Sequence, residues 1–188
     1  MGDKYVFLDR DGVINEDGYG WTEYGYITRW EDFRFLPGVL EGIKKFSEAG
    51  YKCVIISNQQ GVGKGYYTEE QLSEVNKKMV EAIREAGGDI AGSFYCTHTK
   101  EEDCDCRKPR EGLFLKAKEK LEIKELGGKF YIGDTERDIQ AGRTAGLKTI
   151  LVLSGKTSKN DFKKWDNRPD HVCKDLNSAA DLVIGGGI

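Results

Sequence analysis

Long apolar segments are missing from this sequence of 188 residues. No stretch approaches the roughly 18 consecutive apolar residues of a membrane-spanning helix. The apolar run that follows Lys4 is also too short for the central segment of a secretory signal peptide. We therefore expect a cytoplasmic protein that does not bind membranes.

An excess of one charge sign is missing as well. Lysine and arginine together number 29 and aspartate and glutamate 32, which gives a formal net charge of −3. Because the two signs are interspersed, the chain lacks the general positive field with which proteins attract nucleic acids or anionic membranes. We expect no nucleic-acid partner, which leaves local binding of a small polyanion open.

Proline is scarce, and no collagen-like repeat, linker or disordered segment is evident. The chain has 3 prolines, and 38% of its residues are apolar. That content is sufficient for one domain with a sizeable core. The sequence predicts a single domain over residues 1–188, and we expect it to be a monomer.

Apolar strands alternate with amphipathic helices along the chain, which is typical of a parallel sheet covered by helices on both faces. Strands are expected at residues 5–8, 51–57, 93–96, 130–132 and 149–153, with an edge strand at 171–172. Helices are expected between Gly38 and Gly50, at about 69–86, 111–122 and 138–145, and in a short final segment capped by Asn177. The prediction is an α/β fold, a Rossmann-like doubly wound parallel sheet. The segment between Val13 and Ser57 is too short for a separate cap domain.

Two carboxylates, Asp9 and Asp11, directly follow the first predicted strand. Open parallel sheets bind ligands at the carboxyl ends of their strands, so Asp9 is expected at a binding site. One carboxylate of such a pair can act as a covalent nucleophile, while the other passes a proton to the leaving group and later activates water. Taken alone, the pair is also compatible with a solvated turn or a helix N-cap.

Hydrogen-bond donors follow the second predicted strand and recur in a basic loop. Ser57, Asn58 and Gln59 can donate to phosphoryl oxygens, although residues of these types also form ordinary turns. Lys108 can supply a point charge to a transferring phosphoryl group, and Arg107 can bind a phosphate or a hydroxyl of the substrate. An isolated Arg-Lys pair is otherwise typical of solvated surface.

A further acidic segment follows the strand at 130–132. Gly133 permits a tight turn, and Asp134 presents an oxygen ligand suited to a hard cation. Asp138 is expected to orient that site from the second coordination sphere, where it would contact the ligands and not the cation. The alternative is that Asp134 only caps the following helix.

In this order, Asp9-x-Asp11, Ser57-Asn58, Lys108 and Gly133-Asp134-x-x-x-Asp138 resemble the motifs of the haloacid dehalogenase (HAD) superfamily of phosphotransferases. The resemblance implies that Asp9 attacks phosphorus to form an aspartyl phosphate. It also implies that Asp11 protonates the leaving oxygen and then activates water, with Asp11 able to carry a proton at neutral pH. Mg²⁺ would be held by Asp9, the backbone carbonyl of Asp11 and Asp134, while Ser57 and Lys108 would hold the phosphoryl group.

Three cysteines and one histidine are concentrated in residues 96–106. Cys96, His98, Cys104 and Cys106 match a tetrahedral Cys₃His zinc site in ligand type and number. The alternatives are a disulfide, which a reducing cytoplasm disfavours, and free thiols. The sequence predicts a structural zinc loop that braces the segment carrying Arg107 and Lys108.

The pattern Cys-x-His followed by Cys-x-Cys-Arg-Lys-Pro resembles one branch of that superfamily, the D-glycero-D-manno-heptose 1,7-bisphosphate phosphatases and the related histidinol-phosphate phosphatases. The segment from Asn58 to Gly61 is more similar to the heptose enzymes, whose activity is removal of the 7-phosphate. The short gap from His98 to Cys104 is more similar to the histidinol-phosphate type. The aromatic loop at 17–28 is longer than the usual short turn of the heptose enzymes, and we expect it to be either a lid over a sugar or a packed surface flap.

Two other classes of function are compatible with parts of the sequence. A protein that binds a phosphorylated sugar without turnover would need a defect in the catalytic set, and Asp9, Asp11, Ser57, Lys108 and Asp134 are all present. A zinc module that docks nucleic acid would use the basic residues between 100 and 110. Five acidic residues interrupt that basic surface: Glu101, Glu102, Asp103, Asp105 and Glu111.

Overall fold

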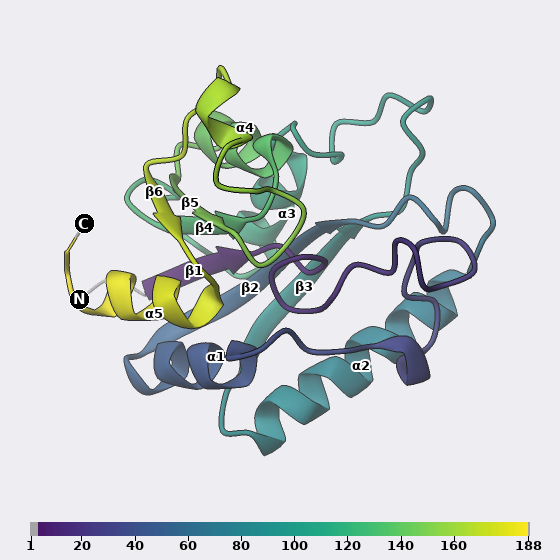
Figure 1. Cartoon of the computed structure of the whole chain (residues 1–188), viewed down its shortest axis with the longest axis horizontal. Helices are drawn as coiled ribbons and strands as arrows, with labels where there is room; N and C mark the ends of the chain where they lie inside the picture. Colours follow the sequence, from purple (N-terminus) through teal and green to yellow (C-terminus); the bar gives the residue numbers. More distant parts are fainter. Residues whose placement is uncertain (1–3, 188) are drawn as a thin grey trace.

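The computed structural model, which describes residues 4–187, contains a six-stranded parallel sheet (Figure 1). Its strand order is β3-β2-β1-β4-β5-β6, and every neighbouring pair is parallel. The strands are β1 (Lys4–Leu8), β2 (Tyr51–Asn58), β3 (Ile90–Cys96), β4 (Phe130–Gly133), β5 (Lys148–Val152) and β6 (His171–Cys173). The predicted α/β fold with a Rossmann-like parallel sheet is confirmed.

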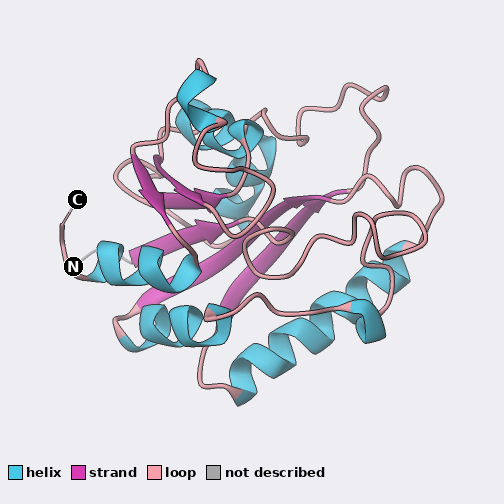
Figure 2. Cartoon of the chain, in the orientation of Figure 1, coloured by secondary structure: helices cyan, strands magenta, loops and turns pink. Residues whose placement is uncertain are grey.

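Helices cover both faces of this sheet (Figure 2). One face packs against α1 (Val39–Glu48), α2 (Glu69–Glu85) and α5 (Leu176–Ile184), and the other against α3 (Gly112–Lys120) and α4 (Glu136–Thr144). Two short 3₁₀ helices, η1 (Trp30–Asp32) and η2 (Phe162–Lys164), were not expected from the sequence. Between β1 and β2 the chain forms only loops, η1 and α1, so the expectation of no cap domain is confirmed. None of the helices in residues 4–187 is long and apolar enough to cross a membrane.

Local capping signals explain where two of the helices begin. Thr68 and Gln71 form the predicted capping box of α2. At α5 the cap is Asp175, whose carboxylate accepts a hydrogen bond from the N–H of Ser178, so the prediction that Asn177 caps this helix is wrong. Asn177 is instead the second residue of α5 and packs over Gly42 of α1, where a Cβ would approach its backbone to 3.1 Å. The two helices approach closely at that point.

The order in which strands join the sheet reverses beside β1. The strands β2 and β3 are added on one side of β1, and β4, β5 and β6 on the other. In sheets of this kind ligands bind outside the carboxyl ends of the strands where the order reverses. Val6, Phe7 and Leu8 are fully buried, which fixes β1 at the centre and places Asp9 at this position.

Candidate active site

A cavity of about 360 Å³ opens at the carboxyl ends of β1, β2 and β4. Parallel strands bring Asp9, Ser57 and Asp134 together there, although they are far apart in sequence. The loop after β3 adds Arg107 and Lys108. The cavity lining contains these residues together with Asp11, Asn58 and Asp138, so all the predicted catalytic and Mg²⁺-binding residues meet at one site.

Lys108 is the buried cation of the site. Its ammonium lies 2.9 Å from Oδ2 of Asp9 and 2.7 Å from Oδ1 of Asp138. It also donates to the hydroxyl of Tyr131 at 2.8 Å and to the carbonyl of Ile56 at 3.1 Å. Burial alone would lower the pKa of Lys108, but Asp138 and Asp9 together raise it, so the residue stays charged.

Three buried carboxylates surround this ammonium. Oxygen atoms of Asp9, Asp134 and Asp138 lie within 4.8 Å of one another. Burial, with Asp138 and Asp9 as neighbours, raises the pKa of Asp134 well above its ordinary range. Burial also raises the pKa of Asp9 to about 6, despite the opposing effect of Lys108. When all three carboxylates are ionised, one lysine leaves two negative charges uncompensated, which fits a divalent, oxygen-preferring cation.

The backbone holds Asp134 in a narrow cradle. A Cβ added to Gly12 or Gly155 would overlap its carboxylate. The N–H of Lys156 donates to Oδ2 of Asp134 at 2.8 Å, and the hydroxyl of Thr157 donates to its carbonyl. The alternative role of Asp134 as a helix cap is wrong, because Thr135 is the N-cap of α4. The carboxylate of Asp138 accepts from the N–H and the hydroxyl of Thr135 and pairs with Lys108.

Asp11 faces a different cation. Arg10 donates to its Oδ1 from Nε at 3.2 Å and from Nη2 at 2.9 Å, and Asn15 donates to the same oxygen at 2.9 Å. Gln59 donates to Oδ2 at 2.7 Å. Burial would raise the pKa of Asp11, but Arg10 and these amides hold it below its ordinary value. This differs from the expectation that Asp11 carries a proton at neutral pH, and the reason is the donor set, Arg10 above all.

Neighbouring residues of the segment after β2 point in different directions. Gln59, which was expected to bind substrate, is fully buried and absent from the cavity lining in this structure. Asn58 lines the cavity, and its amide forms two hydrogen bonds of 3.1 Å with the backbone of Lys108. Gln60, which was expected only as part of the segment from Asn58 to Gly61 and was given no role, lines the cavity and accepts a hydrogen bond of 2.9 Å from Arg107. The only sequence signal for Gln60 as a cavity residue was its position next to Asn58 and Gln59.

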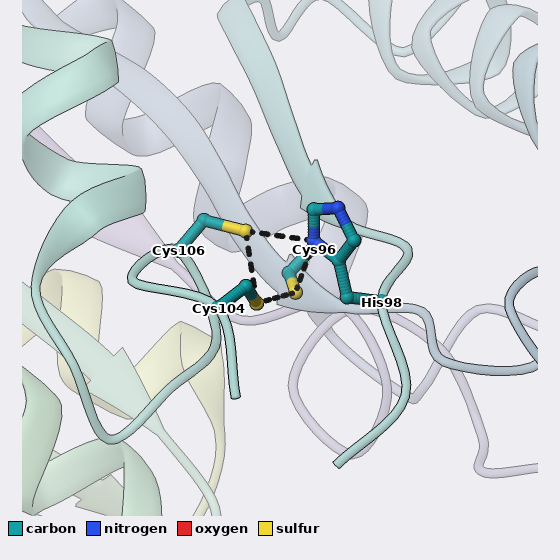
Figure 3. Close-up of side chains that lie close together, drawn as sticks. All are labelled: Cys96, His98, Cys104 and Cys106. Atoms are coloured by element: carbon teal, nitrogen blue, oxygen red, sulfur yellow. Dashed lines mark hydrogen bonds between the residues drawn. The ribbon is translucent and has the colours of Figure 1, made fainter. Parts of the chain in front are cut away.

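Four side chains of metal-binding types converge at the end of β3 and in the loop that follows it (Figure 3). Sγ of Cys96 lies 3.6 Å from Sγ of Cys104, which lies 3.4 Å from Sγ of Cys106. Nδ1 of His98 lies 3.2 Å from Sγ of Cys106 and 3.8 Å from Sγ of Cys96. Zinc at the centre of a tetrahedron separates its S and N ligands by roughly 3.5 to 3.8 Å. The sulfurs are too far apart for a disulfide, in which they lie about 2.05 Å apart. The four separations, from 3.2 to 3.8 Å, are close to those of a zinc site.

The aromatic loop at 17–28 covers part of the cavity. Asp17, Tyr19, Tyr24 and Tyr26 line it, and the ring of Tyr24 stacks on Tyr66 with 4.8 Å between centroids and 4° between planes. Asp17 forms an ion pair of 2.7 Å with Lys156. Of the two expectations for this loop, a lid agrees better with its position than a flap packed elsewhere.

Comparison with known proteins adds independent evidence. Residues 105–179 match the model of a family described as HAD-hydrolase-like. The chain is 36% identical over 97% of its length to the D-glycero-beta-D-manno-heptose-1,7-bisphosphate 7-phosphatase of Pasteurella multocida, covering 97% of that protein. It is 37% identical to the enzyme of the same name from Helicobacter pylori strain 26695, covering 96% of this chain and 97% of that one. Among solved structures, a D,D-heptose 1,7-bisphosphate phosphatase from B. bronchiseptica, complexed with magnesium and phosphate, superposes with a TM-score of 0.86 at 29% identity, covering 97% of this chain and 98% of that chain.

Proposed function

Since the chain belongs to the family of HAD-like D-glycero-beta-D-manno-heptose-1,7-bisphosphate 7-phosphatases, we propose that it removes the 7-phosphate of D-glycero-D-manno-heptose 1,7-bisphosphate through an aspartyl phosphate on Asp9. The observation that carries the proposal is the pairing of Asp9 with Lys108 beside Asp134, at the reversal point of the sheet. The protein is a phosphatase of this family, and the assignment of individual residues is our proposal.

Asp9 is the proposed nucleophile. Its N–H is anchored on the carbonyl of Ile132 at 2.9 Å, and Oδ1 accepts from the N–H of Arg10 at 2.7 Å, so the carboxylate is held in one orientation. Lys108 and the hydroxyl of Ser57 face the same cavity and would hold the oxygens of the transferring phosphoryl group. Because phosphoryl transfer has a loose transition state, such positioning and charge neutralisation supply most of the catalysis.

Mg²⁺ fits the carboxylates of Asp9 and Asp134, and the backbone carbonyl of Asp11 is the third proposed ligand. When bound, the ion neutralises charge on the phosphoryl oxygens. It would also stabilise the ionised form of Asp9, which is the form that can attack phosphorus. Asp138 keeps its two oxygens on Lys108 and Thr135 and is therefore a positioning residue for the ammonium.

Asp11 is the proposed acid and base. In its ionised form, which its neighbours favour, it can activate water to hydrolyse the aspartyl phosphate. To protonate the leaving oxygen it must first gain a proton. The negative charge of an incoming phosphate monoester raises the pKa of a nearby carboxylate, so substrate binding promotes that step.

The zinc cluster has a proposed structural role. Arg107 follows Cys106 directly, donates to the carbonyl of His98 at 3.3 Å and lines the cavity. A metal that fixes Cys106 and His98 therefore fixes both ends of this arginine, which we propose binds the substrate. A single domain acting as a cytoplasmic monomer remains our proposal for the organisation of the protein.

Histidinol phosphate is the second candidate substrate, favoured by the short gap between His98 and Cys104. The test measures Mg²⁺-dependent phosphate release from both anomers of heptose 1,7-bisphosphate and from histidinol phosphate, with Asp9→Asn as the control. A preference of about 100-fold in kcat/KM for the heptose, equivalent to about 2.7 kcal/mol, would support the proposal. A preference for histidinol phosphate would replace the substrate, and turnover retained in Asp9→Asn would refute the mechanism.

A further inference from the structure

A buried hydrogen-bond network lies behind Asp11. It consists of Arg10, Asn15, Gln59 and Tyr67, and we call it the Asp11 network. Arg10, Asn15 and Gln59 are fully buried and Tyr67 is 3% exposed, so these side chains do not reach a substrate from solvent. Only Asp11, whose side chain is 24% exposed, lines the cavity. The network therefore affects the reaction through Asp11 and, by the contact of Gln59 with the hydroxyl of Ser57, through that second cavity residue.

Gln59 has a single orientation in this network. Its Oε1 accepts from Nη2 of Arg10 at 3.0 Å and from the hydroxyl of Tyr67 at 2.6 Å. Arginine can only donate hydrogen bonds, so Arg10 must face the oxygen of the amide. Nε2 of Gln59 is thereby directed at Oδ2 of Asp11, 2.7 Å away, and at Oγ of Ser57 at 3.3 Å.

The two oxygens of Asp11 are held from different sides. Oδ1 accepts from Arg10 and Asn15, while Oδ2 accepts from Gln59 and from Nη2 of Arg10 at 3.1 Å. Loss of Gln59 removes the shortest contact to Oδ2 and leaves the contacts to Oδ1 in place. The carboxylate could then rotate about its bond to Cβ. Proton transfer requires hydrogen-bond reach to the leaving oxygen, so such a rotation would affect the acid step first.

We propose that Gln59, oriented by Arg10 and held in place by Tyr67, is a positioning residue that fixes the direction in which Asp11 delivers its proton. This rests on the proposed function, because it takes Asp11 as the general acid. This role also accounts for the burial of Gln59, whereas the next residue, Gln60, lines the cavity.

Two substrates with different leaving groups test the role. An alcohol such as the heptose needs a general acid to depart, whereas p-nitrophenolate departs without one. The ratio kcat/KM reports only the steps up to leaving-group departure, so hydrolysis of the aspartyl phosphate does not affect it. Gln59→Met keeps the length of the side chain and removes both hydrogen-bonding atoms. Tyr67→Phe removes only the hydroxyl that donates to Oε1 of Gln59.

We expect Gln59→Met to lower kcat/KM for heptose 1,7-bisphosphate about 30-fold and for p-nitrophenyl phosphate less than about 3-fold, part of the 10²- to 10⁴-fold that general acids contribute. Tyr67→Phe should show the same selectivity at about 5-fold. Gln140→Met, at an exposed position of α4, is the matched control and should leave both values unchanged.

Asp11→Asn distinguishes a failure of the proposed general acid from a failure of the positioning role alone. If it impairs both substrates equally, Asp11 is not the general acid, and the positioning role is refuted together with that part of the proposed function. If Asp11→Asn is selective for the sugar but Gln59→Met and Tyr67→Phe are not, the positioning role alone is refuted. Equal losses on both substrates in Gln59→Met would show a structural role only.

Discussion

Nζ of Lys108 lies 2.9 Å from Oδ2 of Asp9, and both side chains are almost completely excluded from solvent. The lysine comes from the loop after β3 and the aspartate from the end of β1. Asn58, at the end of β2 between these two strands, holds the backbone of Lys108 with its amide. The proposed nucleophile and its cation are therefore in contact before any substrate binds.

Replacement of Lys108 should affect both activity and stability. Lys108→Met leaves Asp9 and Asp138 buried without their cation, so we expect kcat to fall at least about 100-fold. Breaking a buried ion pair from one side also costs about 3 kcal/mol of unfolding free energy. Phosphate release and denaturant unfolding at pH 7 measure the two effects. Lys116→Met, at an exposed position of α3, is the control. An unfolding free energy equal to that of the wild type would contradict the proposed pairing.

Mg²⁺ binding should depend on pH. The raised pKa values of Asp9, about 6, and of Asp134 mean that protons compete with the ion for both carboxylates. These groups bind protons more tightly in the folded than in the unfolded chain, so the metal-free protein loses their contribution to stability as the pH rises through the folded pKa values. We expect the increase in Tm caused by Mg²⁺ to be larger at pH 8 than at pH 5.5. A shift independent of pH would argue against these ligands.

The cradle of Asp134 predicts a steric effect of a single methyl group. Gly155→Ala places a Cβ where the carboxylate now lies, so the side chain must move. Displacement of a ligand should weaken Mg²⁺ binding by at least about 10-fold, which the Mg²⁺ dependence of phosphate release measures. Gly127→Ala is the matched control, because a Cβ there meets nothing within 4 Å. Unchanged Mg²⁺ dependence in Gly155→Ala would place the metal away from Asp134.

The thiol cluster predicts zinc in the purified protein. Metal analysis should find about one zinc per chain in the wild type and almost none in Cys104→Ser, since closed structural sites use four protein ligands. Cys173→Ser, outside the cluster, should retain the metal. Because Arg107 contacts His98, loss of zinc should raise KM for the sugar phosphate more than it lowers kcat. Full zinc content in Cys104→Ser would refute the ligand set.

The stacked pair Tyr24 and Tyr66 predicts selectivity at the rim of the cavity. Tyr24→Ala removes the ring that links the loop 17–28 to Tyr66, and we expect KM for heptose 1,7-bisphosphate to rise about 10-fold. KM for p-nitrophenyl phosphate should change less than about 2-fold, because its small ring does not need the lid. Tyr24→Phe retains the stack and should resemble the wild type. Equal changes for both substrates would show that the loop does not recognise the sugar.

Features encoded locally were predictable from the sequence. The order of strands and helices follows from hydrophobic periodicity, and the thiol cluster is contained within residues 96–106. The meeting of Asp9, Ser57 and Asp134 follows from one rule about strand ends. Their arrival at one cavity therefore needed no knowledge of side-chain packing.

Features that depend on side-chain direction were not predictable. Gln59 and Gln60 are identical neighbours in a turn, and nothing in their sequence tells which is buried. Arginine side chains are mostly exposed, yet the guanidinium of Arg10 is buried and pairs with Asp11. At the last helix Asp175 and Asn177 are both favourable N-caps, and packing of α5 against α1 decides between them.

Lys156 belongs to both the rim and the floor of the cavity. Its N–H binds Asp134, whereas its ammonium binds Asp17 of the aromatic loop, and this side chain is 59% exposed. The inner contact is made by the backbone and the outer one by the far end of a flexible side chain. The outer contact can therefore break and reform in water while the inner one persists. The aromatic loop can therefore move to admit substrate and release product, while Asp134 keeps its place beside Asp9 and Asp138 from one turnover to the next.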